Sequence, residues 1–144
     1  MTGLELEITL TIAAAAALLN IWIAQRVGRA RGIAKVSVGD GGHELLTRRM
    51  RAHANYVEYT PFFLILLALI ELARGPVIWL WAVSIVYVLG RILHVFGMDG
   101  AHRLRMIGTI TTMAVLLALA IWAILIAYLD VGFAGAPAPA LPEA

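Results

Sequence analysis

The chain has 144 residues, of which 62% are apolar and only 14% are charged. Ordinary soluble domains are about 45–50% apolar and about 25% charged. This composition therefore excludes an ordinary soluble domain. The net charge of +2, without a basic patch interleaved with aromatic residues, indicates no nucleic-acid partner. The absence of cysteine excludes disulfides, thiolate metal sites and a cysteine nucleophile.

The apolar residues gather in four blocks, each long enough to cross a bilayer as a helix of about 20 residues. The first block begins with two glutamates instead of positive charge, so we interpret it as a retained helix and not a cleaved signal peptide. We expect an all-α membrane protein, a four-transmembrane-helix bundle in a single domain over residues 1–130. The expected helices cover about 5–26, 44–73, 76–98 and 104–129, followed by a Pro/Ala-rich tail at 131–144.

The basic residues predict the orientation. Seven of the 11 Lys and Arg residues lie between the first and second blocks, and two more, Arg103 and Arg105, lie between the third and fourth. The intervening connection holds only Arg74. Cytoplasmic loops carry the excess of Lys and Arg. Both termini are therefore expected outside and both basic loops inside.

The first loop contains the turn sequence Gly39-Asp40-Gly41-Gly42. We expect Asp40 to cap the following helix, because Asp favours helix N-termini. A phosphate-binding loop would need a Gly-Lys-Ser/Thr ending, which is missing.

The second helix carries a polar stripe immediately before its apolar half. At about 100° per residue, Arg48, Arg51, Asn55 and Glu58 fall within roughly 80° of arc, with Tyr59 at the edge. Such a stripe can hold a small zwitterionic ligand, with Arg on its carboxylates and Glu on its ammonium. The alternative is a solvated helix end with snorkelling arginines, the interpretation favoured for Arg48 and Arg49. Glu58 is at interface depth, where ionisable residues are functional candidates.

The third and fourth helices bring further polar residues to the same end. Arg91 and His94 are three residues apart and share a face, and the fourth helix begins with Arg103 and Arg105. A pocket shared with the Arg51 stripe is therefore geometrically possible. The alternatives are that Arg91 is a structural partner of Glu58 or of backbone carbonyls, and that His94 is a satisfied packing residue. The four histidines show no metal-ligand spacing.

These residues resemble the signature of the MAPEG family, the membrane-associated proteins in eicosanoid and glutathione metabolism. The similar stretches are Arg51-Ala52-His53-x-Asn55-x-x-Glu58-Tyr59-x-Pro61, Gly90-Arg91-x-x-His94 and the Arg-rich start of the fourth helix. The basic first loop resembles the bacterial branch, which implies the bacterial inner membrane. Where conjugating members often have tyrosines, this chain has His94 and Met98.

The resemblance implies a homotrimer that binds glutathione between subunits, near the cytoplasmic face. Arg51, Asn55, Glu58, Tyr59 and His94 would hold the peptide. Arg26 or Arg29 would add a contact across the interface. Arg105 matches the arginine that is thought to stabilise the glutathione thiolate. The implied function is a glutathione-dependent transferase or peroxidase that acts on lipophilic electrophiles, without a metal.

Two alternatives stay open at this stage. The first is a non-catalytic lipid-binding or scaffold protein of the same fold, since fold alone does not fix function. The second is a small transporter subunit in which Arg91 and Glu58 line a polar path. The outer half of the expected bundle supplies little polar lining for such a path beyond Glu71.

Overall fold

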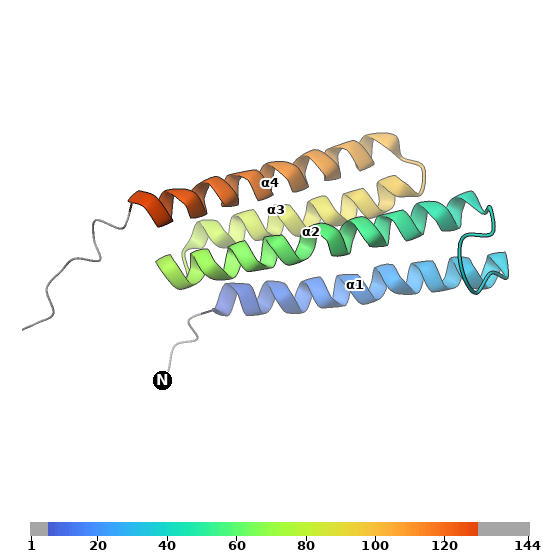
Figure 1. Ribbon diagram of the computed structural model, residues 1–144, viewed down its shortest axis with the longest axis horizontal. Coiled ribbons are helices and arrows are strands. Elements are labelled where there is room, and N and C mark those ends of the chain that lie inside the picture. Colours follow the sequence, from blue (N-terminus) through green and yellow to red (C-terminus); the bar gives the residue numbers. More distant parts are fainter. Residues whose placement is uncertain (1–5, 130–144) are drawn as a thin grey trace, which may run out of the picture.

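The computed structural model describes residues 6–129 as a bundle of four antiparallel helices (Figure 1). The helices are α1 (Glu7–Ala34), α2 (Glu44–Arg74), α3 (Ile78–Met98) and α4 (His102–Leu129). The last three agree with the expected ranges to within two residues. The expected end of the first helix at residue 26 is wrong, because α1 continues through the basic segment to Ala34. The tail expected at 131–144 lies outside the described residues.

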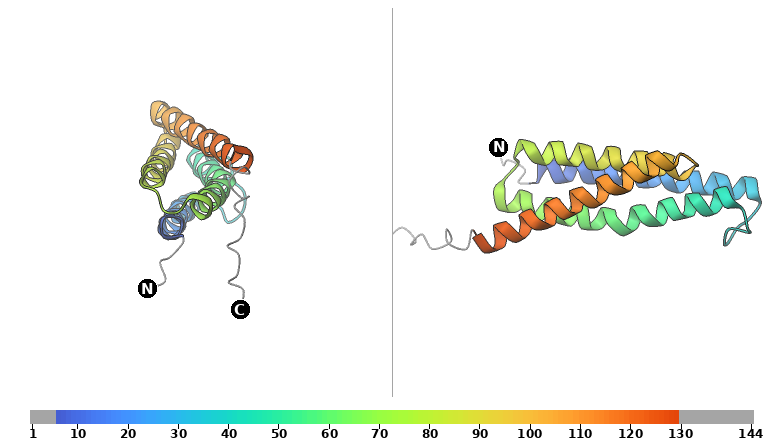
Figure 2. Two further views of the ribbon diagram at one scale, coloured as in Figure 1. Left: turned by 90° about the vertical axis from the view of Figure 1, so that its left-hand side faces the viewer. Right: turned by 90° about the horizontal axis from the view of Figure 1, so that it is seen from above.

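The two ends of the bundle differ in their connections. The end with residues 35–43 and 99–101 is called here the loop end, and the end with residues 75–77 is called the turn end. At the loop end α1 and α2 project beyond the turn between α3 and α4 (Figures 1 and 2). α3 packs most extensively on α4, and α1 packs on α2. Residues at the start of α4 therefore lie beside the projecting part of α2.

All four helices are long and apolar enough to cross a membrane. Large apolar side chains cover the outside of the bundle, as at Leu18 (69% exposed) and Leu117 (63% exposed). Contiguous apolar surface of this kind is unusual on a soluble monomer and is expected where a helix faces lipid or another subunit. The protein is thus an integral membrane protein, as the composition predicts.

The half of the bundle near the turn end has an apolar core. Its buried side chains come from all four helices and include Ile8, Phe63, Leu80 and Leu119. The rings of Phe63 and Tyr87 stack in parallel with centroids 3.7 Å apart. This half resembles the interior of an ordinary helical bundle, and it holds the helices in register for the polar half.

One carboxylate is buried in this apolar half. Glu71 of α2 is 0% exposed, and its two oxygens accept hydrogen bonds of 2.8 Å from the backbone N–H groups of Ile8 and Thr9. The first N–H groups of a helix have no partner within the helix, and the helix dipole favours negative charge there. Glu71 therefore caps α1 from a neighbouring helix, a contact that the sequence did not predict.

Asp40 organises the loop between α1 and α2, although not as the expected helix cap. Its Oδ1 accepts a hydrogen bond from the N–H of Gly42 (3.1 Å), and its Oδ2 accepts one from the Thr47 hydroxyl (2.7 Å). The residue that precedes α2 is His43, which makes no side-chain cap. The Gly42 N–H and the Thr47 hydroxyl stabilise the carboxylate and hold the pKa of Asp40 below its ordinary value.

Two glycines let α3 and α4 approach closely near the loop end. A Cβ on Gly108 would lie 2.6 Å from the Gly90 carbonyl oxygen and 2.7 Å from the His94 Cβ. A Cβ on Gly97 would overlap the backbone of Arg105. Small residues at helix contacts permit this kind of backbone approach in membranes. The close packing brings Arg105 beside the loop end of α3.

Candidate functional site

A polar cavity of about 380 Å³ opens between α2, α3 and α4 in the loop half of the bundle. It is called here the ligand cavity, and it is lined by Arg51, Ala54, Asn55, Glu58, His94, Met98, Arg105 and Thr109. Its volume falls within the range of about 300–1,000 Å³ that is typical of small-molecule sites. The polar stripe of α2 forms one wall, and α3 and α4 form the other.

Five of the residues predicted from the sequence meet in this cavity: Arg51, Asn55, Glu58, His94 and Arg105. Three predicted residues do not line it within one chain. Tyr59 is half-buried beside the stripe, Arg29 is exposed on α1, and Arg26 is buried between helices. The spacing of polar residues on α2 thus predicted one wall of the ligand cavity. The basic start of α4 predicted part of the opposite wall.

The charged groups of the ligand cavity are not paired with one another. Arg51, Glu58 and Arg105 are all exposed, and no ion pair within residues 6–129 involves any of them. Arg105 donates one hydrogen bond, to Nδ1 of His102 at 3.2 Å. Guanidinium groups favour carboxylates and other anions, and a carboxylate favours an ammonium group. The arrangement can therefore bind a zwitterion that carries an excess of negative charge.

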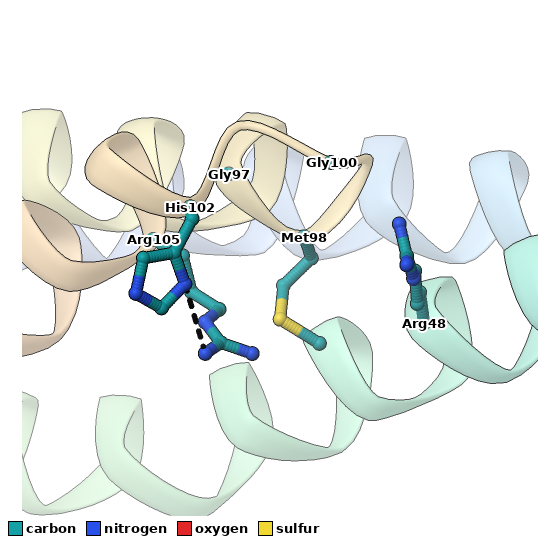
Figure 3. Close-up of a pocket in the computed structure, with 6 residues that line it drawn as sticks. All are labelled: Arg48, Gly97, Met98, Gly100, His102 and Arg105. Carbon is teal, nitrogen blue, oxygen red and sulfur yellow. Dashed lines mark hydrogen bonds between the residues drawn. The ribbon is translucent and has the colours of Figure 1, made fainter.

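A smaller basic cavity of about 160 Å³ adjoins the ligand cavity toward the loop end (Figure 3). The two cavities share Met98 and Arg105. Figure 3 shows Arg48 of α2 at one side of this space and His102 with Arg105 at the other. Within residues 6–129 no carboxylate lines it, but Arg48 forms an ion pair with Glu44, one helical turn away on α2. Arg105 therefore extends positive charge beyond the ligand cavity, whereas Arg48 is partly exposed and paired, in keeping with the solvated position that the sequence favoured.

Arg91 lies on α3 about one helical turn from His94, toward the turn end of the bundle. The sequence left open a pairing of Arg91 with Glu58 or with backbone carbonyls, and within residues 6–129 Arg91 bonds to neither. Its guanidinium donates to Oδ1 of Asn55 at 2.9 Å and to Oγ1 of Thr112 at 3.3 Å. The alternative that His94 is a satisfied packing residue is wrong, since its buried Nδ1 has no hydrogen-bond partner among the described residues.

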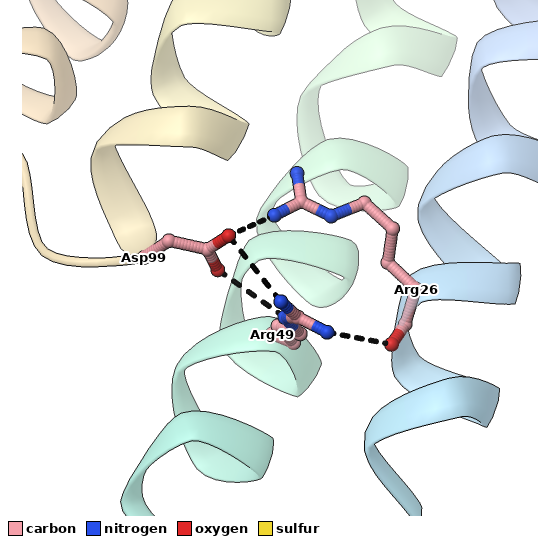
Figure 4. Close-up of polar contacts among 3 residues, drawn as sticks. All are labelled: Arg26, Arg49 and Asp99. Carbon is pink, nitrogen blue, oxygen red and sulfur yellow. Dashed lines mark hydrogen bonds and ion pairs between the residues drawn. The ribbon is translucent and has the colours of Figure 1, made fainter.

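Arg26 is held in an ion cluster at the loop end (Figure 4). It forms an ion pair with Asp99, which also accepts from Nε of Arg49 at 3.3 Å. The Arg26 guanidinium also lies 4.9 Å from the ring centroid of Trp22. The cluster joins α1 and α2 to the turn between α3 and α4. These contacts occupy Arg26, whereas Arg29 is exposed on the surface of α1.

Two residues that contribute to this region, Thr109 and Asp99, were not predicted from the sequence. Thr109 lines the ligand cavity, and its spacing of four residues from Arg105 places both on one face of α4. That spacing was available as a signal. Asp99 was not predictable in the same way, because a single acidic residue in a turn does not reveal which distant arginines it contacts.

The fold and the cavity define a class of small integral membrane protein, a four-helix bundle with a charged pocket at one end. The model of the MAPEG family matches residues 9–125, so the chain belongs to the MAPEG family. The resemblance noted in the sequence is thereby confirmed.

Similar curated proteins are the inner membrane protein YecN of Escherichia coli K12 and its counterpart in strain O6:H1. Each is 36% identical over 89 residues, which cover 61% of this chain and 66% of the relative. The chain thus matches just under two thirds of the length of these relatives. Their name records an inner-membrane location and no reaction.

Proposed function

We propose that this protein is a membrane-bound glutathione-dependent transferase or peroxidase that acts on lipophilic electrophiles. The observation that carries the proposal is the ligand cavity, where Arg51 and Arg105 stand with Glu58, all without an ion-pair partner within residues 6–129. Glutathione has two carboxylates, one ammonium group and a thiol. The two arginines match its carboxylates or its ionised sulfur, and Glu58 matches the ammonium group.

Arg105 is the residue we assign to the reacting sulfur. It projects from the first turns of α4 and is held near α3 by the close approach of Gly97. It lines both the ligand cavity and the smaller basic cavity. A free thiol has a pKa of about 8.5, and an adjacent fixed cation lowers it. Bound glutathione would supply the nucleophile, whose sulfur forms a bond to the electrophilic carbon as the bond to the leaving group breaks. The chain itself then needs no nucleophile.

We propose a homotrimer in the inner membrane, with the ligand cavity on the cytoplasmic side and both termini outside. The excess of basic residues in the two loops at this end supports that orientation. The exposed apolar faces of α1 and α4 supply surface for subunit contacts as well as for lipid. Tyr59 would complete the site from beside the polar stripe of α2, and Arg29 on α1 would reach the site of a neighbouring subunit.

The transporter alternative finds less support than the enzyme. Arg91 is bonded to Asn55 and Thr112, and toward the turn end the bundle is filled by the apolar core. The residues that line the ligand cavity extend toward that half only as far as Glu58 on α2 and Thr109 on α4. The lipid-binding or scaffold alternative uses the same fold, and it is separated from the enzyme by whether Arg105 is needed.

The first experiment is isothermal titration of glutathione into the detergent-purified protein. We expect saturable binding that is lost in an Arg51→Ala/Glu58→Ala double variant. The matched control is Arg103→Ala/Glu7→Ala, which removes the same charges from exposed positions outside both cavities. Binding should be kept in this control. No binding by the native protein, or equal loss in both double variants, would contradict the proposed site.

A further inference from the structure

Arg91 is a buried cation whose partners are all neutral. Its side chain is 1% exposed, and it contacts an amide, a hydroxyl and the ring of Tyr56, whose centroid is 5.4 Å from the guanidinium carbon. No carboxylate within residues 6–129 forms an ion pair with it, and its Nε has no hydrogen-bond partner. Buried charges in proteins are normally paired. A counter-charge from outside this chain would complete the environment of Arg91.

The hydrogen bond to Asn55 fixes how that amide faces the ligand cavity. A guanidinium has donors and no acceptor, so Asn55 must accept with its oxygen. The amide nitrogen with its two N–H groups is then the polar part of Asn55 that remains for a ligand. Because Asn55 lines the ligand cavity, Arg91 determines that the Asn55 side chain offers the ligand donors and not its oxygen.

The other charged and titratable groups around the ligand cavity do not cancel the positive charge of Arg91. α2 supplies Arg51 and Glu58, α3 supplies His94, and α4 supplies Arg105, while α1 does not line the cavity. The arginines therefore outnumber the only carboxylate. Arg91 is more deeply buried than the charged residues that line the cavity. A charge in a low-dielectric interior acts more strongly on its neighbours and is less screened by salt.

We propose that Arg91 is a positioning residue for bound thiol. It holds Asn55 with its N–H groups toward the ligand, and it places a fixed positive charge under the cavity that favours the ionised sulfur. This inference rests on the proposed function and names a second source, besides Arg105, for thiolate stabilisation. The ionised form of glutathione is also a counter-charge of the kind that the buried guanidinium lacks within residues 6–129.

The test compares four variants by two measurements. Arg91→Met removes the charge, Asn55→Asp supplies a carboxylate next to it, and Arg91→Lys keeps a charge with fewer hydrogen bonds. Thr112→Val is the matched control, since it removes the other hydrogen bond of Arg91 on the side away from the ligand cavity. The first measurement is the thiol pKa of bound glutathione, obtained from thiolate ultraviolet absorbance against pH. The second is the Tm of each protein without glutathione.

In the native protein we expect a bound-thiol pKa below the free value of about 8.5. It should rise by about one unit, a tenfold lower thiolate-to-thiol ratio at a given pH, in Arg91→Met and in Asn55→Asp. Arg91→Lys should stay near the native value. Thr112→Val should lower the Tm and leave the thiol pKa unchanged. Asn55→Asp should raise the Tm without ligand, because its new carboxylate pairs with Arg91.

Two different failures can be told apart. If the native protein binds glutathione and lowers its thiol pKa, but Arg91→Met and Asn55→Asp do the same, the inference about Arg91 is overturned and the proposed function stands. If the native protein does not bind glutathione, the proposed function fails. In that case a higher Tm of Asn55→Asp still supports an uncompensated charge that awaits another anion, and an unchanged or lower Tm overturns the inference as well.

Discussion

Glu71 and Arg91 are both buried and charged, but they differ in how far their hydrogen bonds are completed in the two halves of the bundle. Glu71, in the half near the turn end, has both oxygens bonded to backbone N–H groups at the start of α1. Among the described residues, Arg91 in the half near the loop end has only neutral partners, and its Nε has none. The first half encloses an apolar core, whereas the second borders the ligand cavity.

The difference separates a structural charge from a functional one. A buried carboxylate with its hydrogen bonds complete stabilises the fold, because its removal leaves helix N–H groups without partners. A buried cation with incomplete pairing lowers stability until an anion arrives. On this basis the loop half is the part of the molecule adapted to a ligand, and the turn half is its support. Four substitutions test that division.

The largest effect is expected for Arg105→Ala in the loop half. Loss of one preorganised electrostatic donor costs about 10²–10³-fold in kcat, and Arg105 is the exposed arginine shared by both cavities. Turnover of a lipophilic aryl halide with glutathione should fall by about that factor, while the Tm changes little. Arg103→Ala, an exposed arginine two residues away, is the control and should keep the native rate. Native turnover by Arg105→Ala would favour the non-catalytic lipid-binding alternative.

The next effect is expected in the turn half, where Glu71→Leu would leave two helix N–H groups unpaired. Each unsatisfied buried donor costs about 1–3 kcal/mol, so the free energy of unfolding should fall by roughly 2–4 kcal/mol, given that Thr9 is only partly buried. Glu71→Gln keeps one acceptor and should lose about half as much. Unfolding in detergent by SDS titration measures both. A loss of glutathione affinity in folded Glu71→Gln would show that the two halves are not separate.

The sequence predicted the division only in part. The four apolar blocks predicted the helices, and the spacing of Arg51, Asn55 and Glu58 predicted one wall of the ligand cavity, because both signals are local. The partners of Glu71 and Arg91 depend on how helices pack. Glu71 meets residues more than sixty positions away along the chain, and no periodicity encodes that contact. The first helix was also predicted too short, because its basic composition indicated a loop, although Val27, Ala30 and Ala34 keep a helical spacing there.

A smaller effect is expected where α3 and α4 touch. Gly108→Ala would place a methyl group 2.6 Å from the Gly90 carbonyl oxygen, so the two helices must move apart. Overpacking of this kind costs about 1–3 kcal/mol, and it should also displace Arg105 from the ligand cavity. We therefore expect a lower Tm together with weaker glutathione binding. Gly32→Ala is the control, because no atom lies within 4 Å of the added carbon, and it should be neutral or slightly stabilising.

The smallest effect is expected at Asp40, which lies outside both halves. Its folded-state pKa is below the unfolded value, because the Gly42 N–H and the Thr47 hydroxyl stabilise the carboxylate. Its contribution is therefore fully present above the unfolded pKa of about 3.9, and it is lost as the pH falls through the lower folded value. Hydrogen exchange of the Gly42 amide, corrected for intrinsic rates, should lose protection in that acid window.

Asp40→Ala should remove this protection at every pH, since the side chain can no longer accept from Gly42 or Thr47. The amides of α3 and α4 should exchange as in the native protein, because the hydrogen bonds of the carboxylate are confined to the loop and the first turn of α2. Glutathione binding should also be unchanged, since Asp40 lines neither cavity. A loss of binding in Asp40→Ala would mean that the long loop, and not only the loop half of the helices, shapes the ligand site.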